Sequence, residues 1–378
     1  MSRKKLLFIV NVDWFFISHR LPIALKALEQ GFEVHILCAI TDKAEYLESR
    51  GLIVHAFSFS RSGKNIFSEL ASVVNLYKQV KQIKPDLVHL VTIKPVLYGG
   101  IVARLTGVPS LVSAISGLGF LFIERNNLTS SLLLKPVLFL YRIAMGHHNQ
   151  KVIFQNPTDM NALVGSGGAS TDKVRMIRGS GVDLQQYPML PEPTGVPTVI
   201  MISRLLEDKG VLEFVEAASV LNSKGIQACF KLVGEPDFEN PKSVTEKQLQ
   251  SWRDDGIVEC LGFRSDIPGQ LAQANIVVLP SYREGLPKVL IEAAACGRAI
   301  VTTDVPGCRD AIEPDVSGIL VPARDSQALS EAIERLISDS DLRNKMGQAG
   351  RDLAEREFSI DKVVSAHFDI YRELEAGR

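Results

Sequence analysis

Two glutamates eight positions apart, Glu284 and Glu292, are the residues of this chain best placed to do chemistry. Glu284 precedes a turn, Gly285-Leu286-Pro287, and Glu292 lies in the apolar run that follows, which is typical of a buried helix. Lys288 and Val289 would then begin that helix, where N–H groups lack partners and the helix dipole is positive. Such a helix start attracts phosphates and hydroxyl-rich ligands. An ordinary helix N-terminus with a favourable glutamate is the alternative interpretation of this segment alone.

Two cations precede this pair along the chain. Arg204 and Lys209 lie five positions apart in a loop that follows a predicted strand. An arginine grips phosphate oxygens with its planar fork, and a lysine adds a point charge. Together they would neutralise a diphosphate without a metal ion. A surface ion pair with Glu207 or Asp208 is the alternative.

The elements that must position these residues alternate between apolar runs and amphipathic helical patterns. This alternation predicts an α/β protein with parallel sheets covered by helices. Strands are predicted in the first half at Lys5–Val10, Glu33–Cys38, Ile53–Phe57, Leu87–Val91, Ser110–Ser113 and Lys151–Phe154. The second half repeats the pattern at Thr198–Ile202, Ala228–Val233, Val258–Leu261, Ile276–Leu279, Ala299–Thr302 and Gly318–Leu320. First-half helices are predicted at Leu21–Gln30, Lys43–Ser49, Ser68–Lys84 and Tyr98–Thr106.

Five segments, in the expected order, resemble the motifs of glycosyltransferase family four, a large retaining family with the GT-B fold. The stretch Glu284–Glu292 matches the signature E-G-[FL]-P-x-x-x-x-E. The other four are Ser203-Arg204-Leu205-Leu206-Glu207-Asp208-Lys209-Gly210, Leu232-Val233-Gly234, Leu261-Gly262-Phe263-Arg264-Ser265-Asp266 and Val278-Leu279-Pro280-Ser281. The resemblance extends from Ser203 to about Pro322.

The resemblance implies two Rossmann-like domains that face each other across a cleft. Residues 1–187 would bind the acceptor, residues 188–358 the nucleotide-sugar donor, and residues 359–378 would form a helix that packs back on the first domain. The segment Tyr187–Pro197 carries four prolines and is typical of an interdomain linker.

The same resemblance assigns roles at the donor site. Glu284 would contact the sugar hydroxyls and act in catalysis with Arg204 and Lys209, whereas Glu292 would bind the ribose hydroxyls. The leaving phosphate would take the acceptor proton on the same face. No metal is expected, because Arg204 and Lys209 would supply the cations, and no other cofactor is expected; a UDP-sugar would be the donor substrate. The full set of donor-binding residues would be Gly234, Phe263, Arg264, Gly285, Leu286, Pro287, Lys288, Val289 and Glu292.

The first half offers candidate acceptor residues. Asp13–Arg20 replaces the glycine pair that many relatives carry after the first strand, so His19 and Arg20 would meet an acceptor phosphate or, alternatively, cap the next helix. Lys94 would reach a phosphate from the following loop. Ser116 lies where many relatives place a histidine, so no catalytic histidine is assigned. The G-x-G after Ser116 lacks a third glycine, which leaves a dinucleotide fingerprint unsupported.

Charge is distributed unevenly. Residues 1–180 hold 21 Lys and Arg against 11 Asp and Glu, and residues 181–378 hold 21 against 32. A basic half predicts an anionic partner, either a lipid surface or a diphosphate, with a solvated surface as the alternative. The apolar stretch Leu128–His148 is too short and too charged to span a membrane. It is interpreted as an amphipathic helix on an anionic membrane or, alternatively, as a core helix.

Other features of the chain concern its location. The apolar run Leu6–Val10 is too short for a signal peptide. The five scattered cysteines are typical of reduced thiols. We therefore expect a cytoplasmic protein, peripheral on the inner face of a bacterial plasma membrane, with no nucleic-acid partner.

The resemblance is strongest to a subgroup that adds N-acetylhexosamine to undecaprenyl-diphosphate-linked sugars, including transferases that act after bacillosamine. It rests on Arg283–Pro287, Thr303–Arg309 and Asn240-Pro241. The expected activity is retaining transfer of N-acetylgalactosamine, or another N-acetylhexosamine, to such a lipid-linked saccharide in surface-polysaccharide or glycan assembly. Two rivals are a sugar-nucleotide epimerase of GT-B shape and a non-catalytic nucleotide-sugar-binding scaffold. Turnover that requires the lipid acceptor would separate the three.

Overall fold

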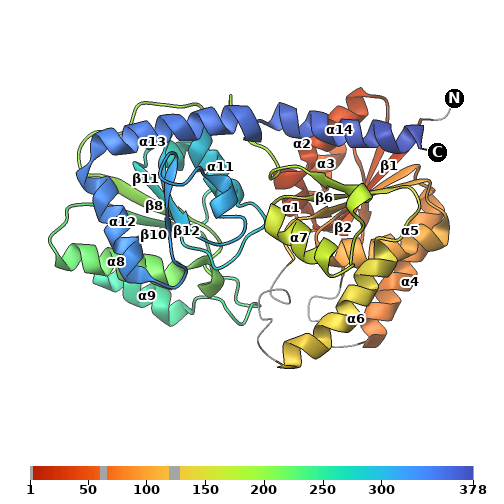
Figure 1. Ribbon diagram of the computed structural model, residues 1–378, viewed down its shortest axis with the longest axis horizontal. Helices are drawn as coiled ribbons and strands as arrows, with labels where there is room; N and C mark the ends of the chain where they lie inside the picture. The colour runs from red at the N-terminus through yellow and green to blue at the C-terminus, as the bar shows by residue number, and fades with distance from the viewer. Residues whose placement is uncertain (1–2, 60–65, 119–127, 378) are drawn as a thin grey trace. The chain divides into compact units, whose positions relative to one another are not determined.

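The computed structural model describes residues 3–59, 66–118 and 128–377, and Figure 1 shows their ribbon. The chain forms two compact units. Unit 1 comprises Met1–Ser180 and Asp361–Arg378, and unit 2 comprises Gly181–Ile360. The chain therefore leaves unit 1 before the boundary expected at residue 187, and it returns near residue 360.

Unit 1 is built on a seven-stranded parallel sheet in the order β3-β2-β1-β4-β5-β6-β7. The order reverses between β1 and β4, and ligands of such sheets bind beyond the carboxyl ends of the strands at this switch point. Six of the strands occur where the sequence predicted them, and β7 was not predicted. The strands are β1 (Lys5–Val12), β2 (Glu33–Ala39), β3 (Ile53–Ala56), β4 (Leu87–Val91), β5 (Ser110–Ile115), β6 (Gln150–Phe154) and β7 (Val174–Met176).

Helices cover the sheet of unit 1, and two apolar clusters fill the space between the layers. The helices are α1 (Asp13–His19), α2 (Leu21–Glu29), α3 (Ala44–Ser49), α4 (Ile66–Ile83), α5 (Gly100–Thr106), α6 (Leu128–Ala144), α7 (Pro157–Gly165) and α14 (Ile360–Ala376). Helix α14 (blue in Figure 1) buries Val363, Phe368 and Leu374, and its Tyr371 hydroxyl lies 2.6 Å from Nδ1 of His89 on β4.

Helix α1 was not predicted, because it begins directly at the end of β1. Its first residue, Asp13, is fully buried. The Asp13 carboxylate accepts hydrogen bonds from the Trp14 N–H at 2.7 Å, the Thr41 N–H at 2.7 Å and the Thr41 hydroxyl at 2.8 Å. A buried carboxylate with this many donors ties the end of β1 to the end of β2, a long-range arrangement that no local periodicity reveals.

Unit 2 repeats the plan with a six-stranded parallel sheet in the order β10-β9-β8-β11-β12-β13. All six strands occur where the sequence predicted them, so the α/β class is confirmed in both halves. The strands are β8 (Thr198–Ile202), β9 (Cys229–Val233), β10 (Glu259–Gly262), β11 (Ile276–Leu279), β12 (Ala299–Thr303) and β13 (Gly318–Val321). The helices are α8 (Val211–Ser223), α9 (Glu246–Asp255), α10 (Ile267–Ala272), α11 (Lys288–Ala295), α12 (Ser326–Ser338) and α13 (Ser340–Leu353).

The proline-rich segment 187–197 is part of unit 2 and not a free linker, which corrects the sequence interpretation. Three arginines hold its first residues. Arg351 donates to the Tyr187 carbonyl at 3.0 Å, Arg298 donates to the Leu190 carbonyl at 3.1 Å, and Arg343 pairs with the Glu192 carboxylate. Each arginine also binds the last carbonyls of a helix, so the segment is fixed by the same groups that cap α10, α11 and α12.

Candidate functional site

Glu284 lies in the loop after β11, where its carboxylate is held by two neighbours. Oε1 accepts a hydrogen bond from the Ser281 hydroxyl at 2.8 Å and forms an ion pair with the ammonium group of Lys209. Ser281 is itself fully buried, and its carbonyl accepts a bond from the Thr303 hydroxyl. The orientation of Glu284 is therefore determined by the sheet beneath it.

Lys209 comes from the neighbouring strand loop. It ends a short 3-10 helix, Glu207–Lys209, which follows β8. Gly210 comes next with φ of +75°, and a Cβ there would lie 2.2 Å from the carbonyl oxygen of Pro280. Only glycine combines this left-handed backbone with so close an approach. The loops after β8 and β11 consequently touch, and Lys209 meets Glu284 at the switch point of the sheet.

A third loop completes the surroundings of Glu284. The backbone N–H of Glu284 donates to the carbonyl of Pro306 in this loop at 3.1 Å. Gly307 follows with φ of +84°, and a Cβ there would lie 2.4 Å from the Glu284 carbonyl oxygen. Beneath them, burial and the Glu284 charge raise the pKa of Cys308 to about 12, so this residue remains a thiol.

Helix α11 begins at Lys288, as the sequence predicted. Pro287 is its N-cap residue and contributes no side-chain hydrogen bond, and Leu286 before it is buried. Glu292 lies on the second turn and is buried. Its Oε1 accepts a hydrogen bond from the Tyr187 hydroxyl at 2.7 Å and lies 3.2 Å from the ammonium nitrogen of Lys288.

Arg204 does not join this cluster. Its guanidinium lies 3.5 Å from the Asp237 carboxylate, and both side chains are exposed. Exposed pairs of this kind contribute little to stability, so Arg204 can exchange its partner for a ligand phosphate at small cost. The partners that the sequence suggested, Glu207 and Asp208, are not the ones that the structure provides.

The turn after β9 places Gly234 between the loops of two other strands. A Cβ on Gly234 would lie 1.8 Å from the Ser203 carbonyl oxygen, and the Gly234 N–H donates to the Gly262 carbonyl at 2.9 Å. Phe263 and Arg264 continue from Gly262 as exposed residues.

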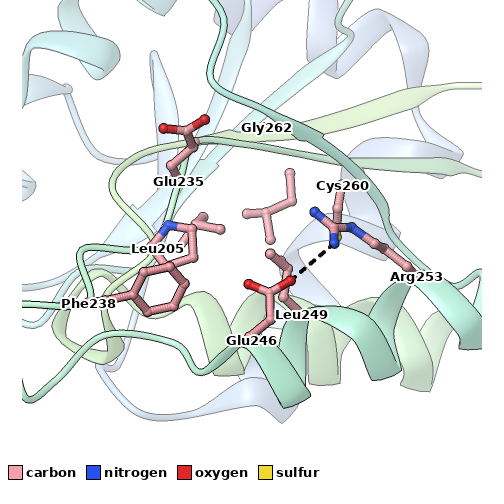
Figure 2. Close-up of a pocket in the computed structure, with 11 residues that line it drawn as sticks. Leu205, Glu235, Phe238, Glu246, Leu249, Arg253, Cys260 and Gly262 are labelled. Carbon is pink, nitrogen blue, oxygen red and sulfur yellow. Dashed lines mark ion pairs between the residues drawn. The ribbon is translucent and has the colours of Figure 1, made fainter.

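A pocket of about 250 Å³ adjoins this turn (Figure 2). Phe238, Leu249 and Cys260 form part of its apolar lining, and Glu246 and Arg253 lie 3.5 Å apart at one side. The pocket shares Gly234 and Gly262 with the turn, so it extends the same region of unit 2.

In unit 1, the predicted acceptor residues follow β1, β4 and β5 at the carboxyl edge of the sheet. Lys94 forms an ion pair with Glu69 of α4 at 2.8 Å. The hydroxyl of Ser116 is buried and has no hydrogen-bond partner among the described residues. His19 stacks on Phe15 with ring centroids 4.0 Å apart.

Arg20 lies in the interior and is only 2% exposed. Its guanidinium donates to the His19 carbonyl at 2.8 Å, and burial lowers its pKa to about 10. This placement argues against an acceptor contact, because a side chain covered by protein offers no surface to a ligand. Arg20 is the N-cap residue of α2, as in the alternative interpretation that it caps the next helix. Its side chain, however, makes no capping hydrogen bond.

Several residues of the site were missed in the sequence. Ser281 holds Glu284, Tyr187 holds Glu292, and the Tyr282 hydroxyl donates to Glu213 at 2.5 Å beside them. One local signal could have indicated Ser281, because it is a small polar residue that follows a buried strand and precedes a glutamate by three positions. Tyr187 had none, because its partner lies more than a hundred residues away.

A parallel sheet whose switch point joins a lysine to a glutamate, in a chain with a second sheet of the same order, has the architecture of a GT-B glycosyltransferase. The family model "Glycosyl transferases group 1" matches residues 186–353, and "Glycosyl transferase 4-like" matches residues 5–156. A full-length relative is 31% identical. The chain belongs to glycosyltransferase family four, as the motifs indicated.

That relative is N,N'-diacetylbacillosaminyl-diphospho-undecaprenol alpha-1,3-N-acetylgalactosaminyltransferase of Campylobacter jejuni, and the match covers 94% of this chain and 97% of the relative. UDP-Gal:alpha-D-GlcNAc-diphosphoundecaprenol alpha-1,3-galactosyltransferase of Escherichia coli is 25% identical over 91% of this chain and 89% of its own. Among solved structures, Anabaena Alr3699/HepE in complex with UDP and glucose superposes with a TM-score of 0.78, at 21% identity, over 98% of this chain and all of its own. The structural likeness establishes the fold.

Two features are absent from the described residues, a membrane-spanning helix and a cluster of metal-ligating side chains. Within residues 3–59, 66–118 and 128–377, no helix combines the length and the apolar character that crossing a membrane requires. The same part of the chain contains no group of three or more His, Cys, Asp or Glu side chains arranged to hold a metal ion.

Proposed function

We propose that this enzyme transfers a sugar from a UDP-sugar to an undecaprenyl-diphosphate-linked saccharide with retention of configuration, and that the sugar is N-acetylgalactosamine or another N-acetylhexosamine. The observation that supports this best is the meeting of Lys209 and Glu284 at the switch point of unit 2, with Glu292 on the second turn of α11. Lys209 supplies a cation for a diphosphate, and Glu284 supplies a carboxylate for sugar hydroxyls. Because the two side chains form an ion pair, both groups lie next to each other.

The residues divide the reaction between them. Lys209 and Arg204 stabilise the charge that develops on the diphosphate as the bond between the sugar C1 and the phosphate oxygen breaks. Glu284 holds the sugar through its hydroxyls, so that an acceptor hydroxyl forms the new bond to C1 on the same face. The leaving phosphate oxygen receives the acceptor proton. Positioning and charge stabilisation then suffice without a metal ion.

The acceptor assignment draws on the relatives and on charge. Both curated relatives are named for undecaprenyl-linked diphospho-sugar substrates. Unit 1 carries the basic half of the chain, and Lys94 follows β4 at its switch point. We assign Lys94 to the acceptor diphosphate, with Glu69 as the partner that it leaves on binding. His19 and Ser116 remain proposed acceptor contacts.

Membrane attachment belongs to the same proposal, and helix α4 supports it. Phe67, Leu70 and Val74 lie on one face of α4 and are 82%, 60% and 47% exposed. Lys78 and Lys81 continue this face toward the end of the helix. An exposed apolar stripe with lysines at one end suits the surface of an anionic bilayer.

Helix α6 contributes less than the sequence suggested. Phe139 is exposed, but Tyr141 is buried and Val137, Leu138 and Leu140 pack against the core of unit 1. The described part of the helix is thus mainly a core element, which favours the alternative interpretation of this stretch. The side chains of 128–135, including Leu133 and Leu134, lie outside the described residues.

A donor screen with purified protein tests the proposed activity. UDP-sugars are incubated with and without an undecaprenyl-diphosphate-linked saccharide, and lipid-linked product is detected by mass spectrometry. We expect turnover of one UDP-N-acetylhexosamine only when the acceptor is present. Conversion of the donor alone would indicate an epimerase, and binding without any turnover would indicate a scaffold; either result contradicts the proposal.

A further inference from the structure

Tyr187 is connected to helix α11 in two ways, directly through its side chain and indirectly through its backbone carbonyl, which binds Arg351. Its hydroxyl donates to Glu292 Oε1 at 2.7 Å, and its carbonyl accepts a hydrogen bond from Arg351 at 3.0 Å. The same Arg351 nitrogen donates to the Ala295 carbonyl at 2.8 Å, at the end of α11. Tyr187 is buried, so its ring cannot swing away from the helix. The tyrosine is therefore locked against the helix that carries Glu292.

The two described contacts of the Glu292 carboxylate are made to the same oxygen, Oε1. Tyr187 and Lys288 both approach Oε1, at 2.7 and 3.2 Å. No described residue hydrogen-bonds to Oε2, which is therefore the oxygen left for a ligand. The ammonium group of Lys288 lies at the end of a long, flexible side chain on the same helix as Glu292, whereas Tyr187 comes from a separate, fixed segment. Tyr187 thus contributes the contact that sets the plane of the carboxylate.

The direction of the hydrogen bond is also fixed. Burial and the neighbouring carboxylate raise the pKa of Tyr187 above its ordinary value, so the hydroxyl keeps its proton and acts as the donor. The carboxylate must then accept, and its other oxygen, Oε2, can only be an acceptor toward a ligand as well. Ribose hydroxyls are donors of the matching kind.

We propose that Tyr187 is a positioning residue that fixes Glu292 to read the ribose hydroxyls of the donor nucleotide. The inference rests on the proposed donor role of Glu292 and adds a residue to it. Without the hydroxyl, the Glu292 side chain keeps only Lys288 and rotates about its own bonds. The ribose then loses a preorganised acceptor, although the fold of unit 2 keeps its other contacts.

Calorimetric binding of two probes, UDP and 2',3'-dideoxy-UDP, which lacks both ribose hydroxyls, tests this inference in the full-length protein. We expect wild-type protein to prefer UDP. In Tyr187→Phe, UDP affinity should fall roughly tenfold, the scale of one hydrogen bond to a charged group, while 2',3'-dideoxy-UDP affinity changes little. The preference for UDP therefore shrinks. A merely structural role would instead lower both affinities by the same factor, and that result, or unchanged UDP binding, overturns the inference.

Two further variants calibrate the measurement. Glu292→Gln should lose most of the preference for UDP by itself, because it removes the negative charge and replaces one of the two acceptor oxygens with an NH2 donor. Tyr371→Phe removes a buried tyrosine hydroxyl in unit 1, whose partner is His89, and should leave the preference unchanged. Thermal melts of all variants identify any loss of folding.

The outcomes also separate this inference from the proposed function. If wild-type protein binds no UDP, or binds UDP and 2',3'-dideoxy-UDP equally, the donor role of Glu292 is wrong and the role of Tyr187 is lost with it. If wild-type protein and Glu292→Gln behave as expected but Tyr187→Phe retains full preference, only the role of Tyr187 is overturned. In steady-state assays, the Tyr187→Phe defect should appear in the donor KM more than in kcat, because ribose binding is shared by ground and transition states.

Discussion

At the scale of single residues, the proposed donor site of unit 2 is organised around carboxylates that are held before any ligand arrives. Ser281 and Lys209 orient Glu284, and Tyr187 and Lys288 orient Glu292. Preorganised groups of this kind need no rearrangement at the moment of reaction. Lys209 serves both roles, since it pairs with Glu284 and carries the charge proposed to stabilise the leaving diphosphate.

Replacing Glu284 by glutamine keeps its shape and removes its charge. We expect Glu284→Gln to reduce kcat/KM by about 100-fold or more, the scale of losing one preorganised electrostatic contact. Steady-state assays with the best donor measure this. Glu313→Gln is the matched control, because Glu313 of the same unit pairs with Arg356 on the surface. A wild-type rate from folded Glu284→Gln would remove the carboxylate from the mechanism.

Metal removal tests the role of the two cations. Because Arg204 and Lys209 are proposed to neutralise the diphosphate, a chelator should change the rate of the wild-type enzyme little. The same assay run with EDTA and then with added magnesium measures the effect. Complete loss of activity that magnesium restores would refute the metal-independent mechanism.

At the scale of elements, glycines decide how closely the strand loops approach. Gly210 and Gly225 both have φ of +75°, but a Cβ on Gly210 would lie 2.2 Å from Pro280, whereas one on Gly225 would meet nothing within 4 Å. The two positions therefore share the same backbone strain and differ only in the contact. This pair isolates the effect of the close approach.

We expect Gly225→Ala to lower the free energy of unfolding by about 1–2 kcal/mol, the cost of a left-handed residue with a Cβ, and to leave activity unchanged. Gly210→Ala should cost more and also reduce activity, because the loop after β8 must move away from the loop after β11 and carry Lys209 with it. Chemical denaturation and donor turnover measure the two effects. Equal stability and equal activity in both variants would contradict the importance of the contact.

Helix α14 docks on unit 1 over buried histidines. His89 and His367 stack with ring centroids 5.5 Å apart, next to Phe8, Tyr371 and the buried Arg20. Burial, like-charge repulsion between the histidines and the Arg20 charge lower the pKa of His89 well below 6.5, and burial with Arg20 lowers that of His367 to about 3. Both rings are therefore neutral in the folded protein.

Acid should consequently destabilise unit 1. Below about pH 6.5 the unfolded chain takes up protons that the folded chain excludes, so stability falls as pH falls from 6.5 toward 3. The slope reaches about 1.4 kcal/mol per pH unit for each histidine. His367→Phe should flatten this dependence, as measured by denaturation at pH 7, 6 and 5. An unchanged pH profile in that variant would show that His367 does not titrate on unfolding.

At the scale of the whole molecule, basic residues gather in the first half and acidic residues in the second. This asymmetry and the exposed stripe of α4 lead to one expectation, that the protein binds vesicles of anionic lipid reversibly and more weakly in high salt. Replacing Phe67, Leu70 and Val74 with serine should release the protein without altering UDP affinity.

Vesicle flotation beside a thermal melt measures this release. A triple serine variant of Leu76, Val80 and Ile83, on the buried face of the same helix, should instead unfold unit 1 and serves as the contrast. If the stripe variant floats like the wild type, α4 is not the membrane contact.

Local patterns in the sequence determined much of this architecture. The positions of the strands could be predicted because buried parallel strands form continuous apolar runs between turn residues. Ser203–Gly210 and Glu284–Glu292 were assigned to one site by their resemblance to family motifs, and each segment follows such a strand with glycines that mark the turn. These features depend on neighbours within a few positions, which is the range that periodicity and turn chemistry report.

Only the tertiary structure decided the rest. Three arginines bring residues 187–193 into unit 2, Asp13 starts an unexpected helix by binding the end of another strand, and Arg20 is covered by protein. Arg204 pairs with Asp237, and Tyr187 reaches Glu292 across more than a hundred residues. Such side-chain partners depend on which surfaces pack together in the folded chain. The local sequence around one partner therefore does not predict the other.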